Sequence, residues 1–223
     1  MGIADSELEV IGRLVDASNA SLLCKLENGE QVIYKPIAGE RPLWDFPDGN
    51  LASREVAAFY ISELGNFNIV PKTVLRDGPF GIGAVQEWID IDEDFDVTSC
   101  AQSANLRIRE MALFDALVNN ADRKFGHILC VDEQNIFGCD HGVTFHEENK
   151  LRTVLWQFAD SDLMPEEIRK IQKCLEQIDD KYLATLITTK EIKSLRNRGR
   201  QLIELGKFPL PNPNWPPVPW PPY

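Results

Sequence analysis

The apolar residues of this chain change their spacing once, at an acidic segment over residues 90–96. Before it they fall in short runs separated by turn residues, as in residues 31–36. After it they recur every three to four residues, as in residues 189–205. Short apolar runs are typical of strands, whereas a period of about 3.6 is typical of amphipathic helices. We therefore expect an α+β protein of two lobes, with a strand-rich N-lobe over residues 1–90 and a mostly helical C-lobe over residues 91–208.

One helix is expected inside the strand-rich lobe, over residues 51–64. Val56, Phe59 and Leu64 share one face of it, and Gly65 follows its last turn. The other expected elements are strands over residues 11–16, 21–26, 31–36, 73–76 and 84–89, helices over residues 103–119, 165–178 and 189–205, and a small hairpin of residues 127–131 and 135–139.

The last segment, residues 209–223, has a composition of its own. It contains eight prolines and two tryptophans and carries no charge. Such a segment favours the polyproline II conformation. We expect it to dock in cis on its own lobe with Trp215 and Trp220 as anchors, and the alternative is that it binds a partner.

Net charge and cysteine usage exclude several classes of protein. The net charge of −12 disfavours nucleic acid as a partner, because sequence-independent binding of phosphates requires positive charge. No apolar run approaches the roughly 20 residues of a membrane span, so we expect no membrane insertion. The five cysteines form no closely spaced pair, which favours reduced thiols and a cytoplasmic location.

Four residues stand in an order that favours phosphoryl transfer. Lys35 ends an apolar strand, Glu55 lies in the first half of the following helix, and Asp122 and Asp140 lie in the helical lobe. Phosphoryl transfer needs a cation at the phosphates, a group that orients the acceptor and a metal ligand. The layout predicts a nucleotide cleft between the lobes, although the usual glycine-rich phosphate-binding motif is absent.

Six segments resemble a bacterial family that is similar to phosphatidylinositol 3-/4-kinases and, more distantly, to HipA-type kinases. The segments are residues 34–36, 39–47, 54–58, 76–81, 122–127 and 140–142, and the likeness covers about residues 8–208. The resemblance implies a protein-kinase-like fold with an ATP·Mg²⁺ site. Lys35 would contact the phosphates and Glu55 would brace it, while Asp122 would be the catalytic aspartate and Asp140 the metal ligand.

The resemblance also implies which residues surround the nucleotide. The turn that contains Ser18, Asn19 and Ser21 is similar to a short phosphate-covering loop, in which backbone N–H groups and hydroxyls replace glycines. The strand residues expected along the adenine base are Gln86, Glu87 and Trp88.

Two positions depart from the family pattern. His127 stands where an asparagine usually binds a second metal ion, and imidazole suits transition metals better than Mg²⁺. Three alternatives follow: a single Mg²⁺ suffices, Mn²⁺ is preferred over Mg²⁺, or His127 has another role such as contacting a phosphate. His141 replaces the apolar residue after the metal-binding aspartate, which leaves a packed core histidine and a catalytic one as alternatives.

Three functions are compatible with these residues. The first is an ATP- and metal-dependent kinase whose acceptor is a hydroxyl of a protein or small molecule; the acidic chain disfavours a lipid surface. The second is a degenerate kinase that binds nucleotide for regulation, or an enzyme that transfers AMP. The third is a zinc enzyme of His127, Cys139, Asp140 and His141, although three successive side chains of an extended segment cannot all face one metal.

Overall fold

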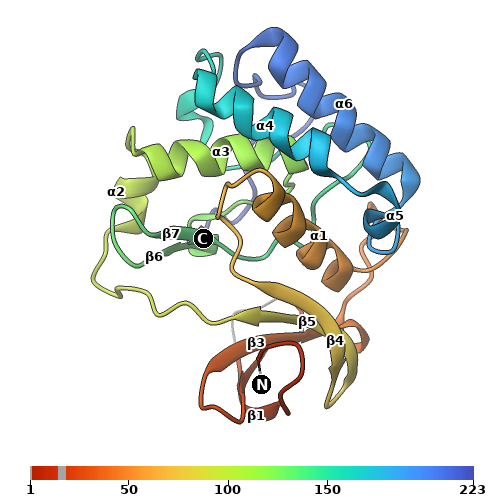
Figure 1. Ribbon diagram of the computed structural model, residues 1–223. Coiled ribbons are helices and arrows are strands. Elements are labelled where there is room, and N and C mark those ends of the chain that lie inside the picture. Colours follow the sequence, from red (N-terminus) through yellow and green to blue (C-terminus); the bar gives the residue numbers. More distant parts are fainter. Residues whose placement is uncertain (1, 15–18) are drawn as a thin grey trace.

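The computed structural model describes residues 2–14 and 19–223 (Figure 1). Its main sheet is antiparallel, with strand order β1-β2-β3-β5-β4. These strands are β1 (Glu9–Arg13), β2 (Leu22–Lys25), β3 (Gln31–Pro36), β4 (Thr73–Gly78) and β5 (Gly81–Glu87). The central position of β3 follows from its sequence, because its β-branched and aromatic residues are buried by neighbours on both sides.

Most helices follow the sheet in the chain. They are α2 (Val97–Ala101), α3 (Leu106–Val118), α4 (Pro165–Gln177), α5 (Asp180–Leu183) and α6 (Thr189–Leu205). A hairpin of β6 (Ile128–Cys130) and β7 (Ile136–Gly138) lies between α3 and α4 in the chain. One more helix, α1 (Leu51–Leu64), connects β3 to β4, and short 3₁₀ turns occupy Ile37–Gly39, Phe125–His127 and Trp156–Phe158.

The element boundaries agree best with the sequence where a local cap determines them. The expected helices over residues 51–64 and 189–205 are confirmed in full as α1 and α6. Helix α3 begins later than expected, because the Asn105 side chain accepts hydrogen bonds from the Arg107 and Ile108 amides and so caps it there. The short helices α2 and α5 were not expected, and residues 15 and 16 of the first expected strand lie outside the described residues.

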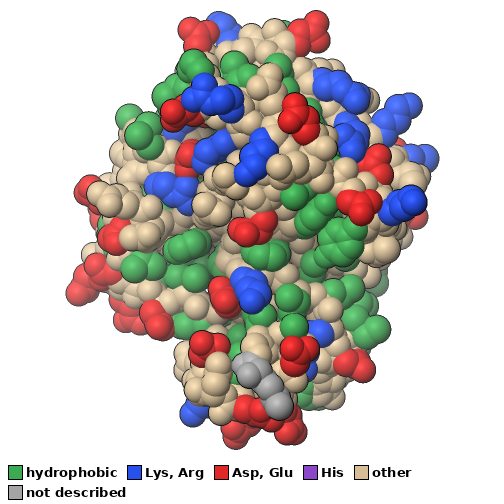
Figure 2. Space-filling view, viewed as in Figure 1, with side chains coloured by type: hydrophobic (Ala, Val, Ile, Leu, Met, Phe, Trp, Pro, Cys, Tyr) green, Lys and Arg blue, Asp and Glu red, His purple; other side chains and the backbone are tan. Residues whose placement is uncertain are grey.

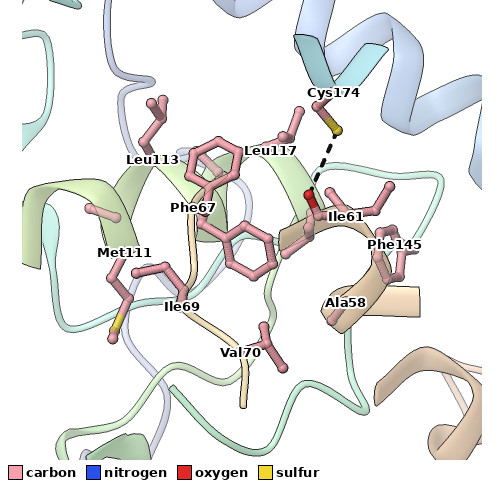
Figure 3. Packing of buried hydrophobic residues seen from close by; sticks show 14 of the residues in the cluster. Ala58, Ile61, Phe67, Ile69, Val70, Met111, Leu113, Leu117, Phe145 and Cys174 are labelled. Atoms are coloured by element: carbon pink, nitrogen blue, oxygen red, sulfur yellow. Dashed lines mark hydrogen bonds between the residues drawn. The ribbon is translucent and has the colours of Figure 1, made fainter. Parts of the chain in front are cut away.

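One large hydrophobic core joins the two halves of the chain. Figure 1 shows α1 between the sheet and the helices α3 and α4. In the core, Ile61 of α1 packs beside Cys174 of α4, whose thiol donates to the Ile61 carbonyl oxygen (Figure 3). Phe67 lies against Phe114 of α3. The helix that carries Glu55 is therefore fixed to the helical half of the molecule, although it belongs to the strand-rich half of the sequence. A second, smaller core lies within the sheet region.

The tail over residues 209–223 lies against the helical half. The Pro217 carbonyl oxygen accepts hydrogen bonds from the Thr153 amide at 3.0 Å and from the Trp156 indole at 2.7 Å. Trp215 is partly buried, but Trp220 is 89% exposed. The expectation that both tryptophans anchor the tail is therefore wrong for Trp220.

Charged side chains of both signs share the surface. On the face drawn in Figure 2, most Lys and Arg side chains lie over the helices, and acidic side chains stand among them. Among the described helices, none combines the length and the apolar composition needed to cross a bilayer.

Candidate active site

A cleft of about 280 Å³ lies between the sheet and the helical half. Residues from four separate parts of the chain line it. The predicted site residues among them are Asn19, Ser21, Lys35, Glu55, Asp122, His127 and Asp140. Predicted site residues up to 121 positions apart in the sequence thus meet in one cavity.

Lys35 lies at the centre of an ion-pair cluster. Its Nζ donates to Glu55 Oε1 at 2.6 Å and also to Asp140 Oδ1. Burial alone would lower the pKa of Lys35, but the carboxylates of Asp140 and Glu55 outweigh that effect and raise it above its ordinary value. The lysine therefore stays charged inside the cleft, as a phosphate ligand must.

Glu55 is held in place from both of its carboxylate oxygens. The second oxygen, Oε2, accepts the backbone N–H of His141 at 3.0 Å, and the residue is 4% exposed. Helix α1 positions Glu55 because its N-terminus is doubly capped: Asn50 accepts from the Ser53 amide, and Glu40 accepts from the Leu51 and Ala52 amides. Glu55 therefore connects the lysine of the sheet to the loop that carries Asp140.

Asp140 has a backbone conformation that is uncommon outside glycine, with φ of +55°. Strained residues of this kind are concentrated at functional sites. Its Oδ1 bonds Lys35, and its Oδ2 lies 3.4 Å from His127 Nε2. The positive charge of Lys35 holds the pKa of Asp140 well below its usual range, so this carboxylate is ionised.

The hydrogen bonds of His127 determine which of its nitrogens is free. Its Nδ1 lies 2.8 Å from the Asp122 carbonyl oxygen, which can only accept, so Nδ1 carries the proton. Burial lowers the pKa of His127 against the opposing effect of Asp140, which favours the neutral ring. The lone pair of Nε2 then faces the Asp140 carboxylate directly. A divalent cation bound between these two atoms would relieve that contact, so the pair fits a metal site.

Asp140 and His127 would supply only part of the ligands of a metal ion. Among residues 2–14 and 19–223, no three or more His, Cys, Asp or Glu side chains converge as a metal cluster. Mg²⁺ and Mn²⁺ in phosphoryl-transfer sites are bound by one or two protein groups, with phosphate oxygens and water as the remaining ligands. Asp140 and His127 match that pattern.

Asp122 lies on the other side of His127, in the loop that follows α3. The left-handed conformation of Asn119, with φ of +56°, ends the helix. The Asn120 side chain then accepts the Asp122 amide and fixes the loop. Asp122 Oδ2 lies 3.3 Å from Lys124 Nζ and its side chain remains partly exposed to the cleft. An accessible carboxylate in this position can orient an acceptor hydroxyl.

Arg123 is the principal site residue that the sequence analysis missed. It is fully buried and forms a bidentate salt bridge with Asp115. Its guanidinium also donates to the carbonyl oxygens of His127 and Cys139. One cation thus connects the loop of Asp122 to the loop of Asp140. A signal was present, since Asp115 is a carboxylate in the middle of the apolar face of a helix, where a charge requires a buried partner.

His141 is a core residue. Its Nε2 lies 2.6 Å from Arg123 Nη2, a donor, and therefore accepts this hydrogen bond. Burial, together with the charges of Arg123 and Lys35, holds the pKa of His141 well below its usual range, so the ring is neutral. Of the two alternatives from the sequence, the packed histidine agrees with this geometry.

The loop expected over the phosphates is found at the cleft. Asn19 and Ser21 line it, and Ser18 lies outside the described residues. The loop packs on the segment after β3, where a side chain at Gly39 would come within 2.5 Å of the Ala20 side chain. Asn19 Oδ1 also accepts the Arg41 amide.

The residues expected along the adenine base lie elsewhere. Gln86 points into the protein, where its Nε2 donates to Thr73 Oγ1 at 2.8 Å. Glu87 and Trp88 line a separate depression, and their amides donate to the Lys72 and Gln31 carbonyl oxygens. None of the three side chains lines the cleft that contains Lys35, because pairing of β5 with both β3 and β4 holds them in the sheet.

A zinc site at residues 139–141 does not agree with the structure. His141 Nε2 faces Arg123 and accepts its hydrogen bond, so it is not available to a metal ion. Among the described residues no three or more His, Cys, Asp or Glu side chains converge to hold one. The zinc alternative is therefore wrong.

Solved structures with the same arrangement of elements are kinases. The Golgi casein kinase with Mn/ADP bound superposes with a TM-score of 0.60 and 12% identity, over 91% of this chain and 73% of that one. The Helicobacter pylori proinflammatory kinase CtkA superposes with a TM-score of 0.52 and 11% identity, over 93% of this chain and 95% of that one. The predicted kinase-like α+β fold is confirmed, and the likeness to phosphatidylinositol 3-/4-kinases and HipA-type kinases stays a prediction.

Sequence comparison then places the chain in a family. No protein-family model matches it. Protein Rv2133c of Mycobacterium tuberculosis (strain ATCC 25618 / H37Rv) is 38% identical over 260 aligned positions, which span 98% of this chain and 93% of that protein. The chain belongs to the same family as Protein Rv2133c.

Proposed function

We propose that this protein is an ATP- and metal-dependent phosphotransferase that acts on a hydroxyl of a protein or a small molecule. The observation that carries the proposal is the ion-pair cluster of Lys35, Glu55 and Asp140 in a cleft that also contains Asp122 and His127. A paired lysine, an ionised metal ligand and an accessible carboxylate are the groups that phosphoryl transfer requires.

Each group has a separate role in the proposed reaction. Lys35, braced by Glu55, binds phosphate oxygens of the nucleotide. Asp140 and His127 would hold a divalent cation, which would neutralise charge on the phosphates. The acceptor oxygen forms a bond to the terminal phosphorus while the bond from that phosphorus to the bridging oxygen breaks. Asp122 takes the proton of the acceptor hydroxyl, and the nucleoside diphosphate leaves.

The first test is metal-dependent nucleotide binding by the wild-type chain and by D140N. At about 100 times the dissociation constant, ADP with Mg²⁺ or Mn²⁺ should stabilise the wild type by about 2.7 kcal/mol. D140N removes the charged metal ligand and should lose the metal-dependent part of this stabilisation. Thermal unfolding with and without nucleotide and metal measures both.

D160N is the matched control, because Asp160 also has a positive φ, of +60°, and pairs only with Lys207 at the surface. It should respond to nucleotide as the wild type does. Absence of any shift in the wild type with either metal would refute the proposal. Mass spectrometry after incubation with ATP and candidate acceptors then separates transfer of a phosphoryl group from transfer of AMP, and from binding without transfer.

A further inference from the structure

Arg152 is bound to the loop of Asp122 by its backbone and its side chain. Its amide donates to the Asn120 carbonyl oxygen at 2.9 Å, and its own carbonyl oxygen accepts the Arg123 amide at 3.1 Å. Its side-chain Nε donates to the Ala121 carbonyl oxygen at 2.6 Å. These three bonds reach the residues on both sides of Asp122, so Arg152 and Asp122 are held next to each other.

The outer part of the Arg152 side chain faces the cleft. Arg152 is one of the residues that line the cavity, together with Asp122 and Lys35. The guanidinium carbon lies 5.4 Å from the centre of the Trp215 ring, and the neighbouring Thr153 amide is bonded to Pro217. The tail over residues 209–223 therefore contacts this side chain through Trp215, in addition to the bonds that Arg152 makes to the Asp122 loop.

The charge of Arg152 has no carboxylate partner in the described part of the chain. Lys35, Lys124 and Lys150 each form an ion pair near the cleft, but no ion pair of Arg152 is found among residues 2–14 and 19–223. Arg41 also lines the cleft without an ion pair among these residues, but it is Arg152 that is bonded to the residues on both sides of Asp122. A half-buried guanidinium beside five carboxylates of the cleft that nevertheless pairs with none of them is available for an anionic ligand.

We infer that Arg152 binds the terminal phosphate of the nucleoside triphosphate, beside the carboxylate of Asp122. A guanidinium matches phosphate oxygens with two parallel N–H donors and stays charged at all working pH values. The phosphate that is transferred must lie next to the group that orients the acceptor. Lys124 already pairs with the Asp122 carboxylate, whereas Arg152 is bonded to the same loop and has no ion pair among the described residues. The inference rests on the proposed function and adds a residue that neither the sequence order nor the resemblance indicated.

The test compares ADP with a non-hydrolysable ATP analogue, because the two differ in the terminal phosphate. R152Q removes the charge but keeps a donor for the Ala121 carbonyl oxygen. It should weaken binding of the analogue with Mn²⁺ by about 10- to 100-fold, the range for a charged hydrogen bond, and change ADP binding less than twofold. R152K, which keeps the charge without the planar fork, should lie between wild type and R152Q.

R169Q is the matched control, since Arg169 lies on the exposed surface of α4 and pairs only with Glu166. It should bind both nucleotides as the wild type does. Equal effects of R152Q on ADP and on the analogue, or no effect on either, would overturn the inference, and the latter result would leave an anionic group of the acceptor as the ligand. Failure of the wild type to bind either nucleotide would instead refute the proposed function itself.

Discussion

At the residue scale, the site depends on buried polar side chains whose hydrogen-bond donors must find their acceptors inside the protein. Arg123 is fully buried and distributes its donors among Asp115, two carbonyl oxygens and His141. A buried donor that loses its acceptor costs the full desolvation free energy, whereas an exposed one is satisfied by water. The histidine at position 141 is explained by this need: Arg123 Nη2 donates one hydrogen to Asp115, and an apolar residue at position 141 would leave its other hydrogen without an acceptor.

H141F should therefore destabilise the protein, although it restores the apolar residue that is usual after the metal-binding aspartate. We expect the free energy of unfolding to fall by about 1–3 kcal/mol, because a buried guanidinium N–H loses its acceptor. Urea denaturation measures the change. A variant as stable as the wild type would show that water or another carbonyl group replaces the imidazole.

At the element scale, α1 is the part of the molecule that decides whether Lys35 and Glu55 meet. Arg54, the residue before Glu55, is 2% exposed and pairs with Glu191 of α6. Its guanidinium also donates to the Thr144 and Asp48 carbonyl oxygens at 3.0 and 2.8 Å. The bonds to Glu191 and Thr144 tie α1 to the helical half at the turn that carries Glu55, which agrees with a preformed Lys35–Glu55 pair.

E191Q tests this attachment of α1. Glu191 accepts from Arg54 with one oxygen and from the Thr188 amide with the other, and an amide can serve only one of these donors. We expect a loss of about 1–3 kcal/mol in the free energy of unfolding and faster hydrogen exchange in α1.

E166Q provides the comparison, because the pair of Glu166 and Arg169 is exposed and such pairs contribute about 0–1 kcal/mol. If both substitutions had the same small effect, the buried pair would not be what holds α1 in place.

At the scale of the whole molecule, the tail and the segment after β3 converge on one lysine. Lys150 Nζ lies 3.3 Å from Asp45 Oδ2, and it lies 5.4 Å from the ring of Trp44 and 5.0 Å from the ring of Trp215. Trp44 and Asp45 belong to the strand-rich half and Trp215 to the tail. The tail thus takes part in joining the two halves beside the cleft.

W215A should weaken this connection, and W220A should not. Trp215 contacts the cations of Lys150 and Arg152, and cation–π contacts contribute about 0.5–2 kcal/mol each when partly desolvated, so a loss of about 1–3 kcal/mol is expected. Trp220 is 89% exposed, and its replacement should stay within about 0.5 kcal/mol. Urea midpoints of the two variants provide the measurement, and equal effects would contradict this account of the tail.

The longer helices could be predicted from the sequence, because the residues that determine where each one begins and ends lie within a few positions of it. Helices α1 and α6 are determined by apolar spacing and by caps such as Asn50 and Thr188 that lie within a few residues of the helix. The kinase-like arrangement could also be predicted, since Lys35 and Asp140 stand in an order that few other reactions require. Such signals can be read from neighbouring residues or from their order alone.

The tertiary structure alone decided which side chains share a partner. Arg152 meets the loop of Asp122 across about 30 residues, and Gln86 points into the protein instead of lining the cleft. Apolar spacing reports which face of an element is buried, but it carries no information on which element covers that face. Which element covers a face is determined only when segments distant in sequence pack together. That packing determines the ion pairs, the contacts of the tail and the lack of an ion pair at Arg152 among the described residues.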